Sequence, residues 1–487
     1  MKTQKPTMNR QARIAISTAL FAIGLVAIYL LLSSALGGLT ELVVGVVILV
    51  AISMAITRLN RLKHIFGMYL LGGRQGIAFV DQLSKRHPRV WNLMADWGLV
   101  MSFGVLSFIF FRKQVSKKIL LLGILSILAT IFIILPNYQL AFQFINLPQL
   151  TAQLSTPQTA QANPFASIIS DAVTLLALVG GFASFIIVLI VYYGLTILYG
   201  LLMFLHTAVV GVPNYGIVTS QTPGVAILLP GISLPFLSGI VALALLLIVH
   251  EFSHGVLARI AKVKLKEIGL IILGSIPLGA YVEPDERQIK KLKEVQQGRI
   301  LIAGIAANFL LAIITFALLI LLINYVLPSF IATKVMVVAT SPNSPAANAM
   351  LSGVQIIKWN GHQISNLTGL FAVASTTPFS KVNLVTSRGN YNLTTNATAK
   401  IGVFLQQTSG PISGSISSGI VYFIYIVLSL SFLLNFFVAA ANLLPLPVLD
   451  GWQLYKLKIK SKVLLNALLW VVLFGLVLNI LPIAYAH

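Results

Sequence analysis

The sequence contains no cysteine, and it is poor in charge of either sign. Among 487 residues only 11 are Asp or Glu, and charged residues make up 9% of the chain. Without cysteine the chain has neither a disulfide framework nor a thiolate that could act as nucleophile or metal ligand. The scarcity of carboxylates also means that any acid in a catalytic or metal site must come from a short set of residues.

Apolar sequence is what the chain has in excess. Hydrophobic residues account for 57% of it, and the mean hydropathy is +0.94. Several runs reach the ~20 residues that a helix needs to cross a bilayer, which predicts an all-α polytopic membrane protein with about eight to ten transmembrane segments. The first apolar run continues to Leu36 without a convincing cleavage site, so we expect no removable signal peptide.

The net charge of +22 is distributed in short stretches that flank the apolar runs. Lys and Arg gather in residues 2–13, 58–89, 112–118, 259–299 and 456–462, whereas residues 119–258 contain none. Basic loops of this kind face the cytoplasm, which places the N-terminus there as well. The lipid bilayer is therefore the expected partner of these charges, and we expect no nucleic acid partner because no basic surface interleaved with aromatics lies outside the flanking loops.

The apolar runs predict individual spans. We expect them at about 13–36, 39–57, 119–135, 237–258, 300–327, 416–441 and 463–484. Residues 96–111 are short and fit either a short span or a re-entrant element. Residues 171–209 are too long for one span and fit a hairpin that turns near Tyr192, Tyr193 and Gly194. The polar segment 136–170 and the proline-rich segment 211–236 are predicted to be external.

Residues 329–410 differ in character from the rest. They are mixed polar and β-branched, with "KVMVVAT" and "KVNLVTS" as expected strands and a turn at Asn360–Gly361. This pattern predicts a small α+β domain inserted between spans. The domain follows a span that runs outward and contains three Asn-x-Thr acceptor sequences, so we expect it on the extracytoplasmic side.

The stretch "LLLIVHEFSHGVLA" places His250, Glu251 and His254 inside an apolar helix. Two histidines four residues apart share one helix face and can bind a single Zn²⁺, with the glutamate as general base for a bound water. Ionisable side chains are costly in a membrane helix unless they are paired or functional. The motif therefore predicts a zinc site with His250 and His254 as ligands and Glu251 as the catalytic residue.

A third protein ligand must be found among the few acids. Glu283 lies closer in sequence, 29 residues after His254, in the charged stretch "YVEPDE". Asp450 lies in "NLLPLPVLDGW", at the inner end of a span, where a carboxylate near lipid needs a strong partner. Sequence distance favours Glu283, and placement favours Asp450.

Three motifs together resemble the site-2 protease family of intramembrane zinc metalloproteases. "HEFSH" matches the HExxH of that family, "NLLPLPVLDG" matches its NxxPxxxxDG, and "GIAAN", Gly304 to Asn308, is similar to its GxxxN. The resemblance covers about 237–484. It implies one zinc ion per chain, cleavage of transmembrane helices of membrane-anchored proteins near the cytoplasmic side, and the following roles: metal ligands His250, His254 and Asp450, catalytic Glu251, and substrate-binding Asn442, Asn308 and Pro445.

The resemblance also implies a division of the chain. Residues 1–210 are expected to form an N-terminal transmembrane region without a recognised role, and 211–328 and 411–487 to form the two parts of the protease core. Residues 329–410 resemble a PDZ domain, because "SPNSPAANAMLSGVQIIKWNGHQI" follows the order of turn, helix, strand and Asn-Gly turn in that module. Within the core, the segment 269–284 is expected to supply a strand edge onto which an unwound substrate could pair. Two rival functions remain open at this stage: a transporter with intramembrane His and Glu, and an unrelated HExxH membrane protease that uses Glu283.

Overall fold

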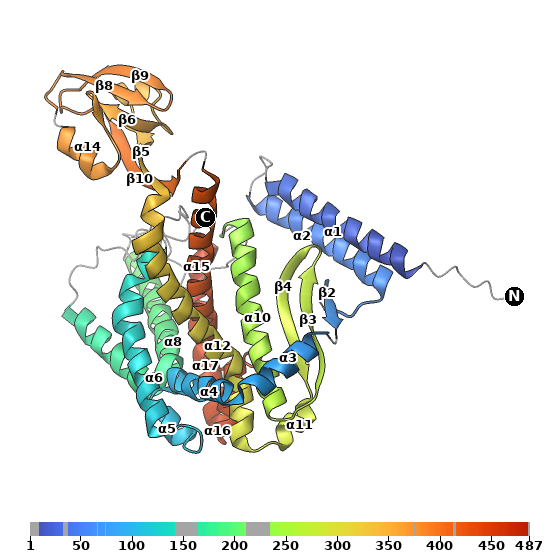
Figure 1. The fold of residues 1–487 in the computed structure, drawn as a ribbon. Helices are drawn as coiled ribbons and strands as arrows, with labels where there is room; N and C mark the ends of the chain where they lie inside the picture. The colour runs from blue at the N-terminus through green and yellow to red at the C-terminus, as the bar shows by residue number, and fades with distance from the viewer. Residues whose placement is uncertain are drawn as a thin grey trace. The chain divides into compact units, whose positions relative to one another are not determined.

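The computed structural model describes residues 9–32, 38–65, 67–73, 75–141, 164–210, 234–374, 376–412 and 415–485 (Figure 1). Most of each predicted external segment, 136–170 and 211–236, lies outside these residues. The chain divides into two compact units. The first comprises Met1–Asn137, Pro148–Phe316 and Leu430–His487, and the second comprises Tyr138–Leu147 and Ala317–Ser429.

Seven helical stretches among the described residues are long and apolar enough to cross a membrane. They belong to α1 (Arg10–Leu32), α6 with η1 and η2 (Lys117–Ala141), α8 (Pro164–Val209), α10 (Phe236–Ile260), α12 with η3 and η4 (Glu294–Ser329), α15 (Ile416–Ala441) and α17 (Lys462–Tyr485). The expected span at 39–57 is part of α2 (Gly38–Asn60), whose apolar stretch Val44–Asn60 is shorter. The helices thus follow the predicted apolar runs closely, because a polypeptide in lipid must satisfy its own backbone hydrogen bonds.

The predicted turn near Tyr192, Tyr193 and Gly194 is wrong, and the stretch 171–209 instead breaks between two helices at Gly181. Helix α8 runs through Tyr192, Tyr193 and Gly194 without a turn, and its only non-helical residue is Gly181, with φ 65°. Helix α17 packs along this part of α8, where Nδ2 of Asn479 donates to the carbonyl of Ile190 at 2.9 Å. At Gly194 the helix lies against Gly475 of α17, and the break falls at Gly181, since glycine tolerates a left-handed conformation.

The short apolar stretch at 96–111 lies in two short helices, α4 (Pro88–Phe103) and α5 (Leu106–Phe110). Every residue of α4 from Ala95 to Phe103 is buried by protein. Its 16 residues are about 24 Å long, short of the hydrocarbon core of a bilayer. In Figure 1, α4 runs across the direction of α6 and α10, so it is a buried helix that lies transverse to the spans of the first unit.

The first unit also contains a four-stranded antiparallel sheet, so the chain is mostly helical and not all-α outside the inserted domain. Its order is β1 (His64–Ile65), β2 (Met68–Gly73), β3 (Leu265–Leu273) and β4 (Ile276–Pro284). The expected strand edge at 269–284 is the hairpin of β3 and β4. Sequence reasoning missed that β2, from the N-terminal region, pairs with β3 over Tyr69↔Ile272 to Gly73↔Ile268, because such pairing depends on long-range contacts.

Two acidic residues of the N-terminal region hold the helices of the core. Asp81 on α3 (Gln75–Arg86) pairs with Arg259 on α10 through both carboxylate oxygens. Asp96 on α4 receives hydrogen bonds from Nε and Nη2 of Arg299 on α12, at 2.8 and 2.6 Å. Bidentate pairs of this kind fix the orientation of both partners. The region between 75 and 103 is therefore built into the core.

Helix α12 lies between α10 and α15 at the centre of the first unit. An aromatic cluster joins α8, α12 and α15: the ring of Phe182 lies 5.2 Å from that of Phe309 and 5.3 Å from that of Phe436. All three side chains are buried. On its other side α12 faces α10 through the polar contacts of the candidate metal centre. Short helices complete the unit: α11 (Glu286–Lys291) and α16 (Asp450–Lys458).

The second unit contains a small α+β domain. Its sheet has the order β10 (Val403–Pro411), β5 (Ile331–Thr340), β6 (Gln355–Trp359), β8 (Lys381–Thr386) and β9 (Gly389–Thr394), with β7 (His362–Gln363) paired to β6. Two short helices, α13 (Pro345–Asn348) and α14 (Leu367–Val373), pack on it. The predicted strands are β5 and β8, and the turn Asn360–Gly361 joins β6 to β7 with both residues at positive φ.

Candidate metal centre

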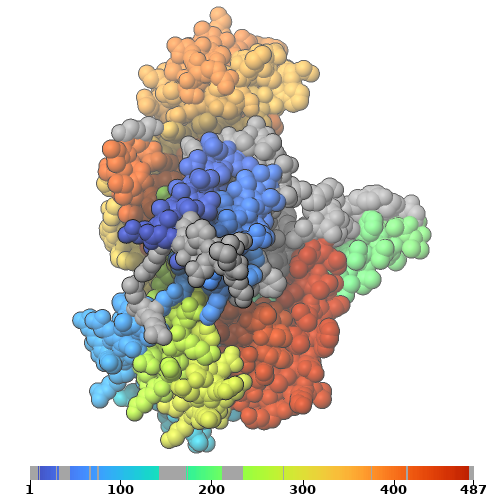
Figure 2. Space-filling view, turned by 90° about the vertical axis from the view of Figure 1, so that its right-hand side faces the viewer, coloured from blue at the N-terminus to red at the C-terminus, as the bar shows by residue number. Residues whose placement is uncertain are grey.

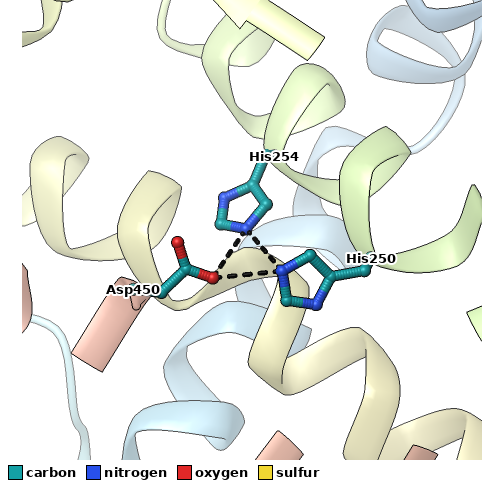
Figure 3. A group of neighbouring side chains, drawn as sticks. All are labelled: His250, His254 and Asp450. Atoms are coloured by element: carbon teal, nitrogen blue, oxygen red, sulfur yellow. Dashed lines mark hydrogen bonds and ion pairs between the residues drawn. The ribbon is translucent and has the colours of Figure 1, made fainter. Parts of the chain in front are cut away.

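Helix α10 presents His250 and His254 on one face, toward Asp450 at the start of α16 (Figure 3). The helix is apolar along its length, and the two histidines are one turn apart. Their side chains are 11% and 14% exposed, and that of Asp450 is 27% exposed. Three ionisable groups thus converge at the edge of an apolar interior, where unpaired charge is costly.

The three groups are spaced as ligands of one metal ion. Oδ2 of Asp450 lies 3.1 Å from Nε2 of His250 and 3.2 Å from Nε2 of His254, and the two nitrogens are 3.3 Å apart. Ligand atoms that each lie 2.0–2.1 Å from a tetrahedral Zn²⁺ are roughly 3.3 Å from one another. The donor set of two imidazoles and one carboxylate also suits zinc and leaves a fourth position open, as catalytic sites require. In the described part of the chain, this is the group of His, Asp and Glu that could hold a metal.

Asp450 reaches this position through a closed loop after α15. The loop begins at Asn442, contains Pro445, and returns so that the N–H of Gly451 donates to the carbonyl of Asn442 at 2.8 Å. A Cβ at Gly451 would lie 2.6 Å from that carbonyl oxygen, so only glycine fits. The number of residues between Asn442 and Gly451 in the motif is therefore the length of a loop that brings Asp450 back to the end of α15.

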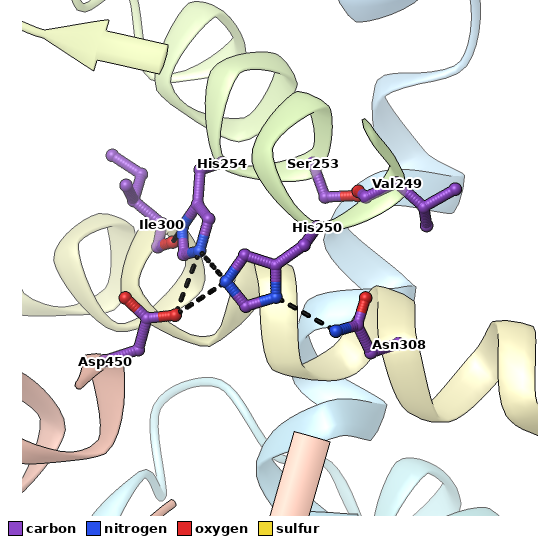
Figure 4. A network of polar contacts seen from close by, with 7 residues as sticks. All are labelled: Val249, His250, Ser253, His254, Ile300, Asn308 and Asp450. Atoms are coloured by element: carbon purple, nitrogen blue, oxygen red, sulfur yellow. Dashed lines mark hydrogen bonds and ion pairs between the residues drawn. The ribbon is translucent and has the colours of Figure 1, made fainter. Parts of the chain in front are cut away.

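Helix α12 orients both imidazoles through contacts with their Nδ1 atoms (Figure 4). Nδ1 of His254 lies 2.7 Å from the carbonyl oxygen of Ile300, so the ring donates there and leaves Nε2 with its lone pair free for a metal. Nδ1 of His250 lies 3.1 Å from Nδ2 of Asn308, which is fully buried. Oδ1 of Asn308 has no partner among the described residues. With the carboxamide turned over, Oδ1 accepts from Nδ1–H of His250, and Nε2 of that ring is again free for a metal.

Gly304 provides the space in which the imidazoles lie. A Cβ at this position would be 2.4 Å from Nε2 of His250 and 2.5 Å from Nε2 of His254. Gly304 lies one helical turn before Asn308, so both residues of "GIAAN" face the histidines. The motif thus combines a gap for the two rings with a hydrogen-bonding partner for one of them.

The two acids considered as third ligand lie in different surroundings. Burial alone would raise the pKa of the Asp450 carboxyl, but the adjacent side chains of His254 and His250 hold that pKa well below its ordinary value. Glu283 lies on β4 and pairs with Lys266 at 2.8 Å, and this hydrogen bond lowers the pKa of the Glu283 carboxyl. The structure therefore places Asp450 beside the histidines, and Glu283 in a largely exposed ion pair.

The other predicted site residues are placed as follows. Glu251 is half-buried next to His250 on α10, Asn442 is half-buried, and Pro445 is buried in the loop before Asp450. Sequence reasoning missed Asp96, which holds α12 through Arg299 immediately before Ile300. An acid in the apolar run "LMADWGLV" was a usable signal, since it needs a partner. The carbonyl of Ile300 gave no signal, because every residue has a backbone carbonyl.

Comparison with known proteins finds similarity to a peptidase family and to an archaeal protein. The model of a family described as "Peptidase family M50" matches residues 238–467, which include the histidines, Gly304, Asn308 and Asp450. An uncharacterized protein of the archaeon Methanocaldococcus jannaschii is 28% identical over 227 residues. That similarity covers 46% of this chain and 57% of the relative, so the chain spans little more than half of the relative's length.

Proposed function

Residues 238–467 belong to Peptidase family M50, and we propose that the chain is an intramembrane zinc metalloprotease of the site-2 protease type. It cleaves transmembrane segments of membrane-anchored proteins near the cytoplasmic side. The observation that carries the proposal is the spacing of 3.1–3.3 Å among Nε2 of His250, Nε2 of His254 and Oδ2 of Asp450. A transporter would not require this ligand geometry.

The residues around the metal position divide the chemistry. A bound zinc ion would lower the pKa of a water toward ~7 and so supply hydroxide at neutral pH. His250, His254 and Asp450 would hold the ion, and Ile300 and Asn308 would fix the two rings. Glu251, beside His250 on the same helix, would take the proton from the water and later deliver it to the leaving amine.

A substrate helix must unwind before it can be cut, because its backbone groups are paired within the helix. Pairing as an added strand would hold an unwound segment in extended form. In the four-stranded sheet β3 is paired on both sides, whereas β4 has β3 as its one partner among the described strands. Since β4 also packs against α10, we propose β4 as the strand that receives substrate, with Asn442 as a further backbone anchor.

The placement in the cell follows from the charge distribution. The seven apolar helices found among the described residues, together with the family, support a multi-pass membrane protein. We propose that it lies in the cell membrane with its N-terminus in the cytoplasm and with the domain at 329–410 outside as a PDZ-like module. The three Asn-x-Thr sequences are consistent with that side, although the side chains of Asn366 and Asn396 also make local hydrogen bonds.

The test uses the purified full-length chain and a panel of single-span substrates. Cleavage should disappear with a chelator and return with zinc. Glu251→Gln should keep about one zinc per chain and lose cleavage by about 10²–10⁴-fold, because the glutamate acts as base and not as ligand. Cleavage that survives both complete zinc removal and Glu251→Gln would refute the proposal.

A further inference from the structure

A basic cavity of about 450 Å³ lies in the first unit, away from the metal centre. It is lined by the loop between α5 and α6, the start of α12 and the end of α16. Both views place these segments at the lower end of that unit (Figure 2). Four cations line it: Arg112, Lys113, Lys293 and Lys458. Glu294 is the one carboxylate among its described lining residues.

The cavity has an excess of positive charge that its own residues do not balance. The ammonium of Lys458 is already paired with Glu294, and it also lies 4.6 Å from the centre of the Phe111 ring. Arg112, Lys113 and Lys293 are exposed and have no carboxylate within 4 Å in the described part of the chain. Converging cations of this kind suit a phosphate group, which accepts several charge-assisted hydrogen bonds at once.

The cavity lies at the depth where membrane-spanning helices begin. Candidate spans start at Lys117, at Glu294 and at Lys462. Lys113 and Lys458 precede two of these starts by four residues, and Lys293 precedes the third directly. The three cations are therefore level with the polar layer of a bilayer, where phospholipid head groups lie.

The remaining walls fit the other parts of a lipid. Ile109 and Phe110 are 65% and 41% exposed and line the same cavity, which gives acyl chains an apolar surface. Gln114 also lines it and is 7% exposed. Its Nε2 donates to the carbonyl of Val295 at 2.9 Å, while its Oε1 is buried without a partner among the described residues. Gln114 thus joins this wall of the cavity to the start of α12.

We propose that this cavity binds the head group of an anionic glycerophospholipid, with the phosphodiester at the cations and the acyl chains along Ile109 and Phe110. The positive-inside rule accounts for basic residues in these loops, but it does not require them to converge on one cavity with an apolar wall. A lipid that contacts Lys293 and Lys458 would link α12 to α16, the helices that carry Gly304 and Asp450. The binding does not depend on the catalytic proposal.

The test measures binding to the purified full-length chain by native mass spectrometry and by the shift in thermal unfolding temperature. The probes are phosphatidylglycerol, phosphatidylcholine and inorganic phosphate. We expect one saturable phosphatidylglycerol, weaker binding of phosphatidylcholine, and no competition from inorganic phosphate at equal concentration. Saturation by inorganic phosphate that displaces the lipid would assign the cavity to a soluble phosphate and overturn the lipid.

Two double variants distinguish binding in the cavity from attraction by the overall positive charge of the protein. Arg112→Gln with Lys293→Gln should weaken phosphatidylglycerol binding by roughly tenfold or more. Lys290→Gln with Lys291→Gln removes the same charge from an exposed face of α11 outside the cavity and should leave binding unchanged. Equal weakening by both pairs would overturn the site. If the first pair does not purify folded, Lys113→Gln serves in its place, and unchanged binding in that variant would also overturn it.

Discussion

Gly304 faces His250 so closely that a Cβ at position 304 would lie 2.4 Å from Nε2 of that histidine. The nitrogen is the one that points toward Asp450, so a methyl group would displace a ligand atom itself. Gly304→Ala should therefore reduce zinc affinity by about tenfold or more and reduce cleavage with it. Zinc content and cleavage of the purified variant give the measurement.

The matched control for this prediction is Gly419→Ala. Gly419 lies in α15, and a Cβ there would meet nothing within 4 Å. This variant should keep zinc and activity, since alanine also favours a helix. A Gly304→Ala protein with full zinc content would show that the two histidines do not need this gap.

The identity of the third ligand can be tested by comparing two acids. Asp450→Ala should lower zinc affinity by far more than about tenfold, because it removes one of three ligands. Glu283→Ala removes only an exposed partner of Lys266 and should keep the metal. The zinc content of both purified variants is measured. If Glu283→Ala loses zinc and Asp450→Ala keeps it, the assignment of Asp450 as third ligand is overturned.

Asn308 should act on the metal through His250. Asn308→Ala removes the partner of Nδ1 and should weaken zinc binding by about 10–100-fold, whereas Asn308→Asp retains an oxygen acceptor and should retain most of the affinity. Zinc titration and cleavage kinetics are measured together. If Asn308→Ala binds zinc normally and only KM rises, Asn308 serves substrate binding, as the family resemblance implies.

The pair of Asp96 and Arg299 should stabilise the first unit and the metal centre together. Asp96→Asn leaves the guanidinium of Arg299 largely buried without its counter-ion, which should lower stability by about 3 kcal/mol and weaken zinc binding. Thermal unfolding with and without zinc provides the readout. Glu286→Gln, which breaks the exposed pair with Lys290, is the control and should change neither quantity. An unaltered unfolding temperature in Asp96→Asn would contradict a structural role for the N-terminal region.

The sequence by itself predicted the features that depend on local pattern. Apolar runs predicted the helices, because a chain in lipid must pair its backbone groups within each segment. The β-branched segments and the Asn360–Gly361 turn predicted the α+β domain, because strands and tight turns also have local sequence patterns. The hairpin at 192–194 was wrong because its sequence signal, a pair of tyrosines and a glycine, is weaker than the packing of α17 against α8.

The candidate metal residues were also predicted from the sequence, since His250, His254 and Asp450 are chemically unusual in apolar surroundings. Only the tertiary structure decided how they meet. The loop from Asn442 to Gly451 brings Asp450 within 3.1 Å of a histidine 200 positions earlier. Three further features depend on which helices pack together: the hydrogen bond from His254 to the Ile300 carbonyl, the space at Gly304, and the pairing of Asp96 with Arg299. Packing is set by shapes and contacts far apart in the chain, and a linear pattern does not contain them.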